Sequence, residues 1–336
     1  MALGLIVLIF GIYSPTQVAA ADVSSASLVS FDFSTPSTGY GAFTREPSSG
    51  DTCRDYVGRT TDGGAIFGDS AFVYSWNCSK DIFSSSLASD GRGDVFLYGP
   101  QLFISHDDAR TWTRIPQLGP ILDVDAEGLS VWLVESICKG GEPAKRDCSI
   151  ALEVSDNGGR TWSSLPAPPG SITGYRSPTP GQSFLARTSR STAYLMLEPH
   201  APFGSTPTAF PFWITTDGGK TWSNRRVACP IDALHVVYSV APDGSIMVVC
   251  ASGPSAGMQL KSVLESSDQG KTWTVESRPG QKRLSDLDAG YLGFVDLVSK
   301  EEGFLVGGRS SLLETRDGGK VWSALQPLIG SSAGGT

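Results

Sequence analysis

The sequence predicts an all-β fold of six repeated units, each with four antiparallel strands; seven units are the alternative. Three observations support this prediction. An eight-residue pattern occurs six times, its copies start at near-even intervals, and 39 Gly with 21 Pro suit a chain rich in turns. No segment shows the apolar spacing of an amphipathic helix. A period of about fifty residues is typical of one supersecondary unit per copy, so the 336 residues are expected to form one closed array.

Each copy of the pattern predicts a tight β-hairpin. Ser or Thr is followed two residues later by Asp or Asn, then two later by Gly or Ala, and an aromatic residue ends the copy three further on. The Asp side chain can accept hydrogen bonds from its own turn, and Gly permits a positive φ. The copies begin at residues 60, 105, 155, 215, 266 and 315. The structural positions of the pattern are Asp62, Asp107, Asn157, Asp217, Asp268, Asp317, Trp112, Trp162, Trp222, Trp273 and Trp322.

This pattern resembles the Asp-box, or BNR, repeat of sialidase-like β-propellers. Residues 155–162 (SDNGGRTW), 215–222 (TTDGGKTW) and 315–322 (TRDGGKVW) carry the resemblance most clearly, whereas the first copy ends in Phe67 instead of Trp. The resemblance covers residues 28–325 and implies a six-bladed β-propeller with each box at the turn between the third and fourth strands of a blade. The chain is also similar to BNR-like proteins related to photosystem II stability and assembly factors, which implies a binding role.

The N-terminal residues suggest an export signal. Residues 3–13 form an apolar run that is too short to span a bilayer, and Ala19, Ala20 and Ala21 precede Asp22. We therefore expect a signal peptide at 1–21, a single propeller domain at 22–328 and a flexible tail at 329–336. A buried first strand is the alternative for residues 3–13. The expectation is a secreted or extracytoplasmic protein with no stable membrane insertion after cleavage.

Six cysteines in a chain with an export signal predict three disulfides. Placed on the propeller, the sequential pairs all fall on the side opposite the boxes, which we call the loop face; the other side is the box face. The predicted pairs are Cys53–Cys78, Cys138–Cys148 and Cys229–Cys250. The long loops 44–55, 139–147, 166–182, 198–211 and 251–260 belong to the same face, where binding residues are usually found. The alternative is that the disulfides only hold these loops in place.

Polar residues of the loop face are the candidates for a binding site. They include Arg54, Asp55, Tyr175, Arg176, Arg283 and Arg309. Charged side chains of this kind more often form a solvated rim than a binding site. Phe203, Phe210 and Phe212 could stack on a sugar or a protein partner, but a small core beneath a long loop is the favoured interpretation.

Sialidase activity would need an arginine cluster for the substrate carboxylate and a tyrosine nucleophile. These families carry Arg-Ile-Pro on the first strand, whereas Arg114-Ile115-Pro116 follows Trp112 here and is expected on an outer strand. The first inner strand, residues 28–33, has Asp32 and no arginine. The sequence therefore favours a non-enzymatic module that binds an unknown protein or carbohydrate. The alternatives are a sialidase-like glycoside hydrolase and an assembly or stability factor for an envelope protein complex.

Composition narrows the range of partners. The net charge is -8 and the pI about 4.9, with no basic stripe, which argues against nucleic acid binding. The three histidines are widely separated, and no Cys-x-x-Cys or phosphate-binding loop occurs, so neither a metal nor a cofactor is expected. We expect a monomer.

Overall fold

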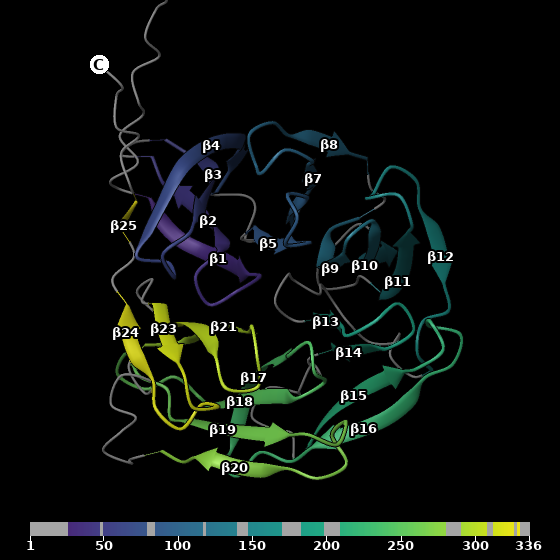
Figure 1. Cartoon of the computed structure of the whole chain (residues 1–336), viewed down its shortest axis with the longest axis vertical. Helices are drawn as coiled ribbons and strands as arrows, with labels where there is room; N and C mark the ends of the chain where they lie inside the picture. The colour runs from purple at the N-terminus through teal and green to yellow at the C-terminus, as the bar shows by residue number, and fades with distance from the viewer. Residues whose placement is uncertain are drawn as a thin grey trace, which may run out of the picture.

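Six antiparallel sheets surround a common axis in the computed structural model (Figure 1). The model describes residues 26–47, 50–78, 85–116, 119–139, 147–169, 183–197, 209–279, 290–307, 312–325 and 328–329. The prediction of a six-bladed β-propeller is confirmed, with four antiparallel strands contributed to each blade by consecutive chain. In the part of the chain that is described, no helix is long and apolar enough to cross a membrane.

The blades follow the order of the sequence, and the first strand of each lies nearest the axis (Figure 1). Blade one contains β1 (Ser27–Phe33), β2 (Gly39–Arg45), β3 (Thr52–Thr60) and β4 (Ile66–Asn77). Blade two contains β5 (Ser86–Ser89), β6 (Val95–Tyr98), β7 (Leu102–Ser105) and β8 (Thr113–Ile115). Blade three contains β9 (Ile121–Glu127), β10 (Ser130–Lys139), β11 (Asp147–Ser155) and β12 (Ser163–Leu165).

The second half of the ring repeats this arrangement. Blade four contains β13 (Ser183–Arg187), β14 (Ala193–Leu197), β15 (Phe210–Thr215) and β16 (Ser223–Val227). Blade five contains β17 (Ala233–Val240), β18 (Ile246–Ser252), β19 (Lys261–Ser266) and β20 (Thr274–Ser277). Blade six contains β21 (Leu292–Leu297), β22 (Gly303–Gly307), β23 (Leu312–Thr315) and β24 (Ser323–Leu325).

All six boxes lie between the third and fourth strands of their blades and share one hydrogen-bond scheme. The hydroxyl of the first residue donates to the Asp or Asn two residues later at 2.8–3.1 Å. In the five boxes with Gly at the fifth position, the same hydroxyl accepts that glycine's N–H at 2.8–3.0 Å. The acidic or amide oxygen accepts the N–H of the seventh residue at 2.8–3.0 Å. The local pattern thus fixes each turn through its own side chains.

The hydrophobic core lies between neighbouring blades. Phe212 of blade four packs in one cluster with Tyr238 of blade five, and its ring meets that of Trp273 edge-on at 6.0 Å. A Cβ on Gly270, which has φ of +72°, would lie 2.2 Å from the Phe212 ring. The fifth box therefore needs glycine both for its backbone conformation and for the close approach of the adjacent blade.

The ring closes in a way that the sequence did not indicate. Ser27 and Leu28 belong to β1 of blade one, and residues 22–25 lie outside the described part. β25 (Leu328–Ile329) leaves blade six and pairs in parallel with the outer strand β4, at Ile66 and Phe67. The contact depends on strands far apart in the sequence, so local patterns carry no signal for it.

Two of the predicted disulfides are confirmed, Cys53–Cys78 and Cys229–Cys250. In the third predicted pair, Cys138 is disulfide-bonded and faces Cys148 in the β10–β11 ladder, but the side chain of Cys148 lies outside the described part. That pairing stays a prediction. The predicted signal peptide and the C-terminal residues 330–336 also fall outside the described residues.

Candidate functional site

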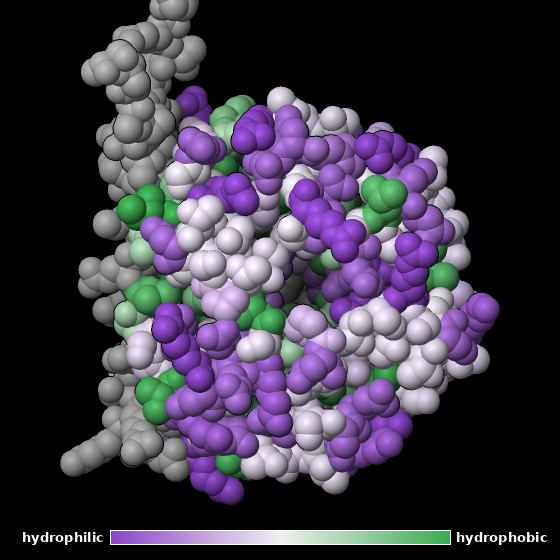
Figure 2. All heavy atoms as spheres, viewed as in Figure 1, coloured by the Kyte–Doolittle hydropathy of each residue, from purple (hydrophilic) through white to green (hydrophobic). Residues whose placement is uncertain are grey.

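The inner strands enclose a small central cavity. Its walls come from β1, β5, β9, β13, β17 and β21, and its volume is about 130 Å³. Figure 2 shows the face of the ring hollowed at this point. Alternate residues of a strand point to opposite sides, so every second residue of these strands can face the axis.

Four aspartates line the cavity, and each also forms a hydrogen bond with the inner strand of the next blade. Asp32 accepts a hydrogen bond from the hydroxyl of Ser89. Asp296 accepts the N–H of Phe33 at 2.8 Å. The remaining two, Asp123 and Asp125, both lie on β9 and both bond β13 of blade four. The cavity is therefore both an acidic chamber and the place where blades are joined.

Asp123 is the most buried of the four. Its carboxylate accepts the Tyr98 hydroxyl at 2.7 Å and the N–H groups of Val124 and Leu185 at 2.8 and 2.6 Å. Burial nonetheless raises the pKa of Asp123 to about 7, against the effect of these donors. Burial also raises the pKa of Tyr98, so the tyrosine remains a donor at neutral pH.

Asp125 is joined to a cation. The Arg187 Nε lies 2.8 Å from Asp125 Oδ1, and the rest of the fully buried guanidinium donates to the hydroxyl and carbonyl oxygens of Ser130 at 2.8 and 2.6 Å. Burial still raises the pKa of Asp125 above its ordinary value. Because Arg187 is committed to these oxygens, it is a link between blades three and four.

The cavity suits a small cationic group better than an acidic sugar. None of the described residues that line it is Lys, Arg or His. Its volume of about 130 Å³ is below the roughly 300–1,000 Å³ of ordinary ligand pockets. Asp32 faces it where a sialidase would need an arginine, so a substrate carboxylate would be repelled there.

A larger hollow lies on the box face between blades five and six. Its volume is about 590 Å³, and it is bounded by the two box turns and by the turn after β21. Glu265 and Glu276 stand on the blade-five side, with Lys300 3.3 Å from Glu265 and Lys320 3.7 Å from Glu276. Both lysine side chains are at least half exposed, whereas both glutamate side chains are mostly buried. We call this feature the inter-box groove.

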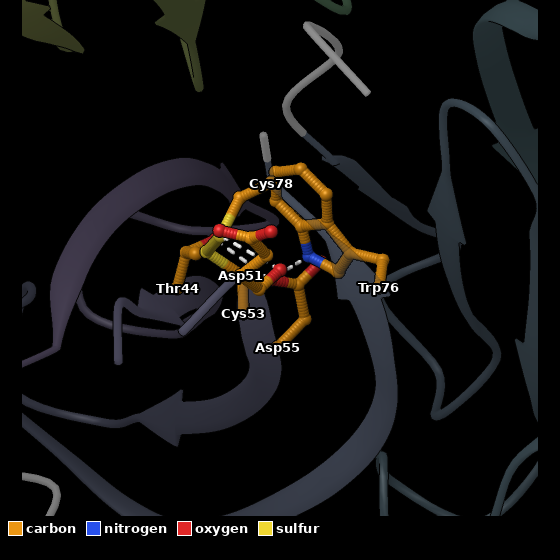
Figure 3. Close-up of a disulfide and its surroundings, with 6 residues drawn as sticks. All are labelled: Thr44, Asp51, Cys53, Asp55, Trp76 and Cys78. Atoms are coloured by element: carbon orange, nitrogen blue, oxygen red, sulfur yellow. Dashed lines mark hydrogen bonds between the residues drawn. A yellow bond between two sulfur atoms is a disulfide. The ribbon is translucent and has the colours of Figure 1, made fainter. Parts of the chain in front are cut away.

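The structure describes two of the six candidate residues on the loop face. Arg54 is exposed on β3, and Asp55, next to it, is buried. Figure 3 shows Asp55 beside the Cys53–Cys78 disulfide, accepting hydrogen bonds from Thr44 at 2.7 Å and from Trp76 at 3.1 Å. Ser85 donates a third at 2.5 Å. The Asp55 carboxylate thus ties blade one to the chain entering blade two, while the side chain of Arg54 is exposed to solvent.

The other four candidates, Tyr175, Arg176, Arg283 and Arg309, lie outside the described residues, so their grouping with Arg54 stays a prediction. Arg114 and Ile115 lie on the outer strand β8, as expected. Phe210 and Phe212 are buried in the core between blades four and five. This agrees with the interpretation of Phe210 and Phe212 as core residues rather than ligand-binding residues.

Sequence reasoning missed Asp123, Asp125 and Asp296 as residues of the cavity. The available signal was Asp-x-Asp in residues 123–125, because residues two apart on an inner strand share a face. In the described part of the chain, no three His, Cys, Asp or Glu side chains are grouped to hold a metal ion. The four aspartates are spread around the ring and bonded to neighbouring blades.

Comparison with known proteins agrees with the repeat. The family model for the BNR/Asp-box repeat matches residues 213–224, which contain the fourth box. The chain is a six-bladed β-propeller that carries the BNR/Asp-box repeat. Among curated proteins, this propeller is similar to the chloroplastic photosystem II stability/assembly factor HCF136 of Arabidopsis thaliana, with 25% identity over 285 residues. The match covers 83% of this chain but 64% of the relative, so the chain spans less than two thirds of that protein.

Solved structures share the fold. One is YCF48 bound to a D1 peptide, with a TM-score of 0.50 and 15% identity, covering 90% of this chain and 82% of the other. Another is a GH74 enzyme of Niastella koreensis, with a TM-score of 0.53 and 16% identity, covering 91% of this chain and 47% of the other. The same architecture therefore occurs in a peptide-bound protein and in an enzyme, so the fold alone does not decide between the two.

Proposed function

We propose that this propeller is a protein-binding factor that assists the assembly or stability of an extracytoplasmic protein complex. The observation that carries the proposal is the similarity to HCF136, which extends over 285 residues and is not confined to the boxes. The fold shared with YCF48 bound to a D1 peptide adds support for a polypeptide partner. The proposed function is therefore that of an assembly factor, which was an alternative on sequence alone, rather than that of a general binding module.

The inter-box groove is the proposed contact for the partner. Its volume of about 590 Å³ falls within the range of ligand pockets, whereas the central cavity is too small for a peptide. Lys300 and Lys320 are at least half exposed, whereas Glu265 and Glu276 are mostly buried, so a cationic group of a partner that displaced a lysine would take over its pairing with a glutamate. A polypeptide segment carrying both charge signs would match this lining. The loop-face candidates, including Arg54, would form a second contact.

The disulfides support an oxidising compartment, since such bonds persist outside the cytosol. Together with the predicted signal peptide at 1–21, they lead us to propose an exported, monomeric protein. A carbohydrate ligand on the loop face stays the alternative to a protein partner.

Site-specific photo-crosslinking in the source cells tests the proposal. A photoreactive residue would replace Arg316, which lines the groove and has a 73% exposed side chain. A matched probe would replace Phe72, which is 52% exposed on the outer strand β4. We expect a discrete polypeptide adduct from position 316 that is lost when Lys300 and Lys320 are both changed to Glu. Equal adducts from both probes, or none from position 316, would contradict a partner in the groove.

A further inference from the structure

The boundary between blades six and one, which we call the seam, differs from the other five inter-blade boundaries. At each of those the chain passes from the outer strand of one blade to the inner strand of the next, whereas at the seam it passes from β24 only to the outer edge of blade one, as β25. Among the described residues, the strand pairing at the seam is that of β25 on β4, through Leu328 with Ile66 and Ile329 with Phe67. Side chains must supply the rest of the closure.

Two carboxyls line the cavity at the inner end of the seam. Asp296 of blade six accepts the N–H of Phe33 at 2.8 Å, and the residue before Phe33 is Asp32. Asp32 accepts a hydrogen bond from Ser89 of blade two. Both carboxyls line the same small cavity, and the charge of Asp32 acts on Asp296. The inter-blade bonds therefore place both acids in one small cavity at the boundary between the first and last blades.

The surroundings of this pair are acidic. Asp123 and Asp125 face the same cavity from β9, and Asp90, just after β5, adds a further negative charge near Asp32. Tyr98 donates its hydroxyl to Asp123, and the guanidinium of Arg187 is bound to Asp125 and Ser130. Ser89 and Ser239 contribute hydroxyls. Among the described residues that line the cavity, nothing positive offsets the charge of the pair.

The proton affinity of the pair follows from this environment. Burial, opposed by the Ser89 hydrogen bonds, raises the pKa of Asp32 to about 6. Burial and then the charge of Asp32 raise the pKa of Asp296 well above its ordinary value. Asp32 therefore loses its proton as the pH rises through about 6, whereas Asp296 holds its proton to a higher pH than an ordinary aspartate.

We propose that Asp32 and Asp296 form a proton-operated latch, which holds the first and last blades together while the pair retains a proton and loosens the seam when both carboxyls are ionised. A carboxyl that is protonated more readily in the folded state stabilises it fully below its unfolded pKa of about 4. That stabilisation is lost as the pH rises through the folded value, which for Asp32 is about 6. The seam is therefore expected to be tightest in acidic surroundings.

Hydrogen exchange of the intact chain tests the latch. Exchange would be followed at about pH 5 and about pH 8, with rates corrected by unstructured reference peptides. Peptides from β1, β21 and β25 should exchange roughly tenfold faster at the higher pH after correction, the factor expected for one pKa unit. Peptides from β18, which contributes no carboxyl to the cavity, should keep their protection. Equal loss of protection in all blades would overturn the proposal, because it would indicate general destabilisation.

Two variants separate the latch from other acidic groups. Asp296→Asn keeps an oxygen that can accept the Phe33 N–H but removes the charge, so the pH dependence at the seam should disappear. Asp123→Asn is the matched control, because Asp123 also accepts an inter-blade N–H in the cavity, but at a boundary that the chain itself crosses. That control should retain the pH dependence at the seam. Persistence of the pH dependence in Asp296→Asn would overturn the proposal, and the wild-type pH series decides by itself should that variant fail to fold.

Discussion

Phe33 and Phe304 stack almost parallel, with ring centroids 3.9 Å apart and planes 14° apart, across the boundary between the first and last blades. Phe31 meets the same Phe304 ring edge-on at 6.4 Å. These aromatic contacts supply apolar closure at a boundary where, in the described part of the chain, two residues of β25 pair with β4. The ring is therefore held shut mainly by side chains.

Removing the stack of Phe33 on Phe304 should lower the free energy of unfolding. Phe304 is 1% exposed, so Phe304→Ala should lower the free energy of unfolding by about 3–5 kcal/mol, the usual cost of a buried Phe. Urea denaturation followed by tryptophan fluorescence measures it. The control Phe72→Ala removes a half-exposed ring whose contact is an edge-on pair with Tyr56, and should cost less than about 1.5 kcal/mol. Equal losses in the two variants would contradict the role given to Phe304.

The hydroxyl of the first residue of a box should contribute more to stability than its position in an exposed turn suggests. Thr215 is 1% exposed; its hydroxyl donates to Asp217 and accepts the buried N–H of Gly219 at 2.9 Å. Thr215→Ala leaves that N–H without its acceptor, which should cost about 1–3 kcal/mol of unfolding free energy. Thr215→Ser keeps the hydroxyl and should restore most of the loss. An unchanged urea midpoint in Thr215→Ala would show that the scheme shared by the six boxes is not needed for stability.

Protonation of the box carboxylates should lower the free energy of unfolding in acid. Hydrogen bonds from the hydroxyl and N–H of Thr221 lower the pKa of Asp217 to about 2. A lowered folded pKa means that the stabilisation is present above the unfolded value of about 4 and is lost as the pH falls towards 2. Asp217→Asn should keep the turn, because Asn157 already does so in box three, donating to Thr161 at 2.8 Å. The stability difference between wild type and Asp217→Asn should therefore shift in favour of the variant as the pH falls from about 4 to 2. A difference independent of pH would contradict the assignment.

No release of a fluorogenic leaving group from sialosides is expected. The central cavity has a volume of about 130 Å³, and Asp32 faces it from the first inner strand, where a carboxylate-binding arginine would be needed. A fluorimetric assay of the purified chain measures this. Turnover that disappears in an Arg176→Ala variant would contradict the binding role and favour the hydrolase.

The fold could be predicted because the boxes are local. Ser or Thr, Asp and Gly bond one another within eight residues, so six copies in the sequence predict six turns of the same kind. The pairing of β25 with β4 could not, since it joins Leu328 to Ile66 and leaves no periodic signal. Asp55 was selected as a binding residue because it is charged and lies near a loop. Its partners Thr44, Trp76 and Ser85 come from separate segments, so only the structure reveals that it is buried and bonded.

The inter-box groove could not be predicted either, because Glu265 and Lys300 meet only when blades five and six are packed together. The cavity aspartates were partly accessible. Asp32 was considered as an inward-facing residue, and the structure places it there. Alternation along β9 and β21 would have placed Asp123, Asp125 and Asp296 in the same cavity had inner strands been compared position by position.

The central claim is that the propeller assists the assembly of a protein complex through the inter-box groove. The most direct measurement is the abundance of mature envelope complexes in cells that lack the protein, separated by native electrophoresis and identified by mass spectrometry. We expect one complex to decline and its partly assembled forms to accumulate. Wild type should restore it, as should Phe72→Ala, whereas the double change Lys300→Glu and Lys320→Glu should not. Unaltered complexes in the deletion strain, or full restoration by the doubly changed groove, would contradict the claim.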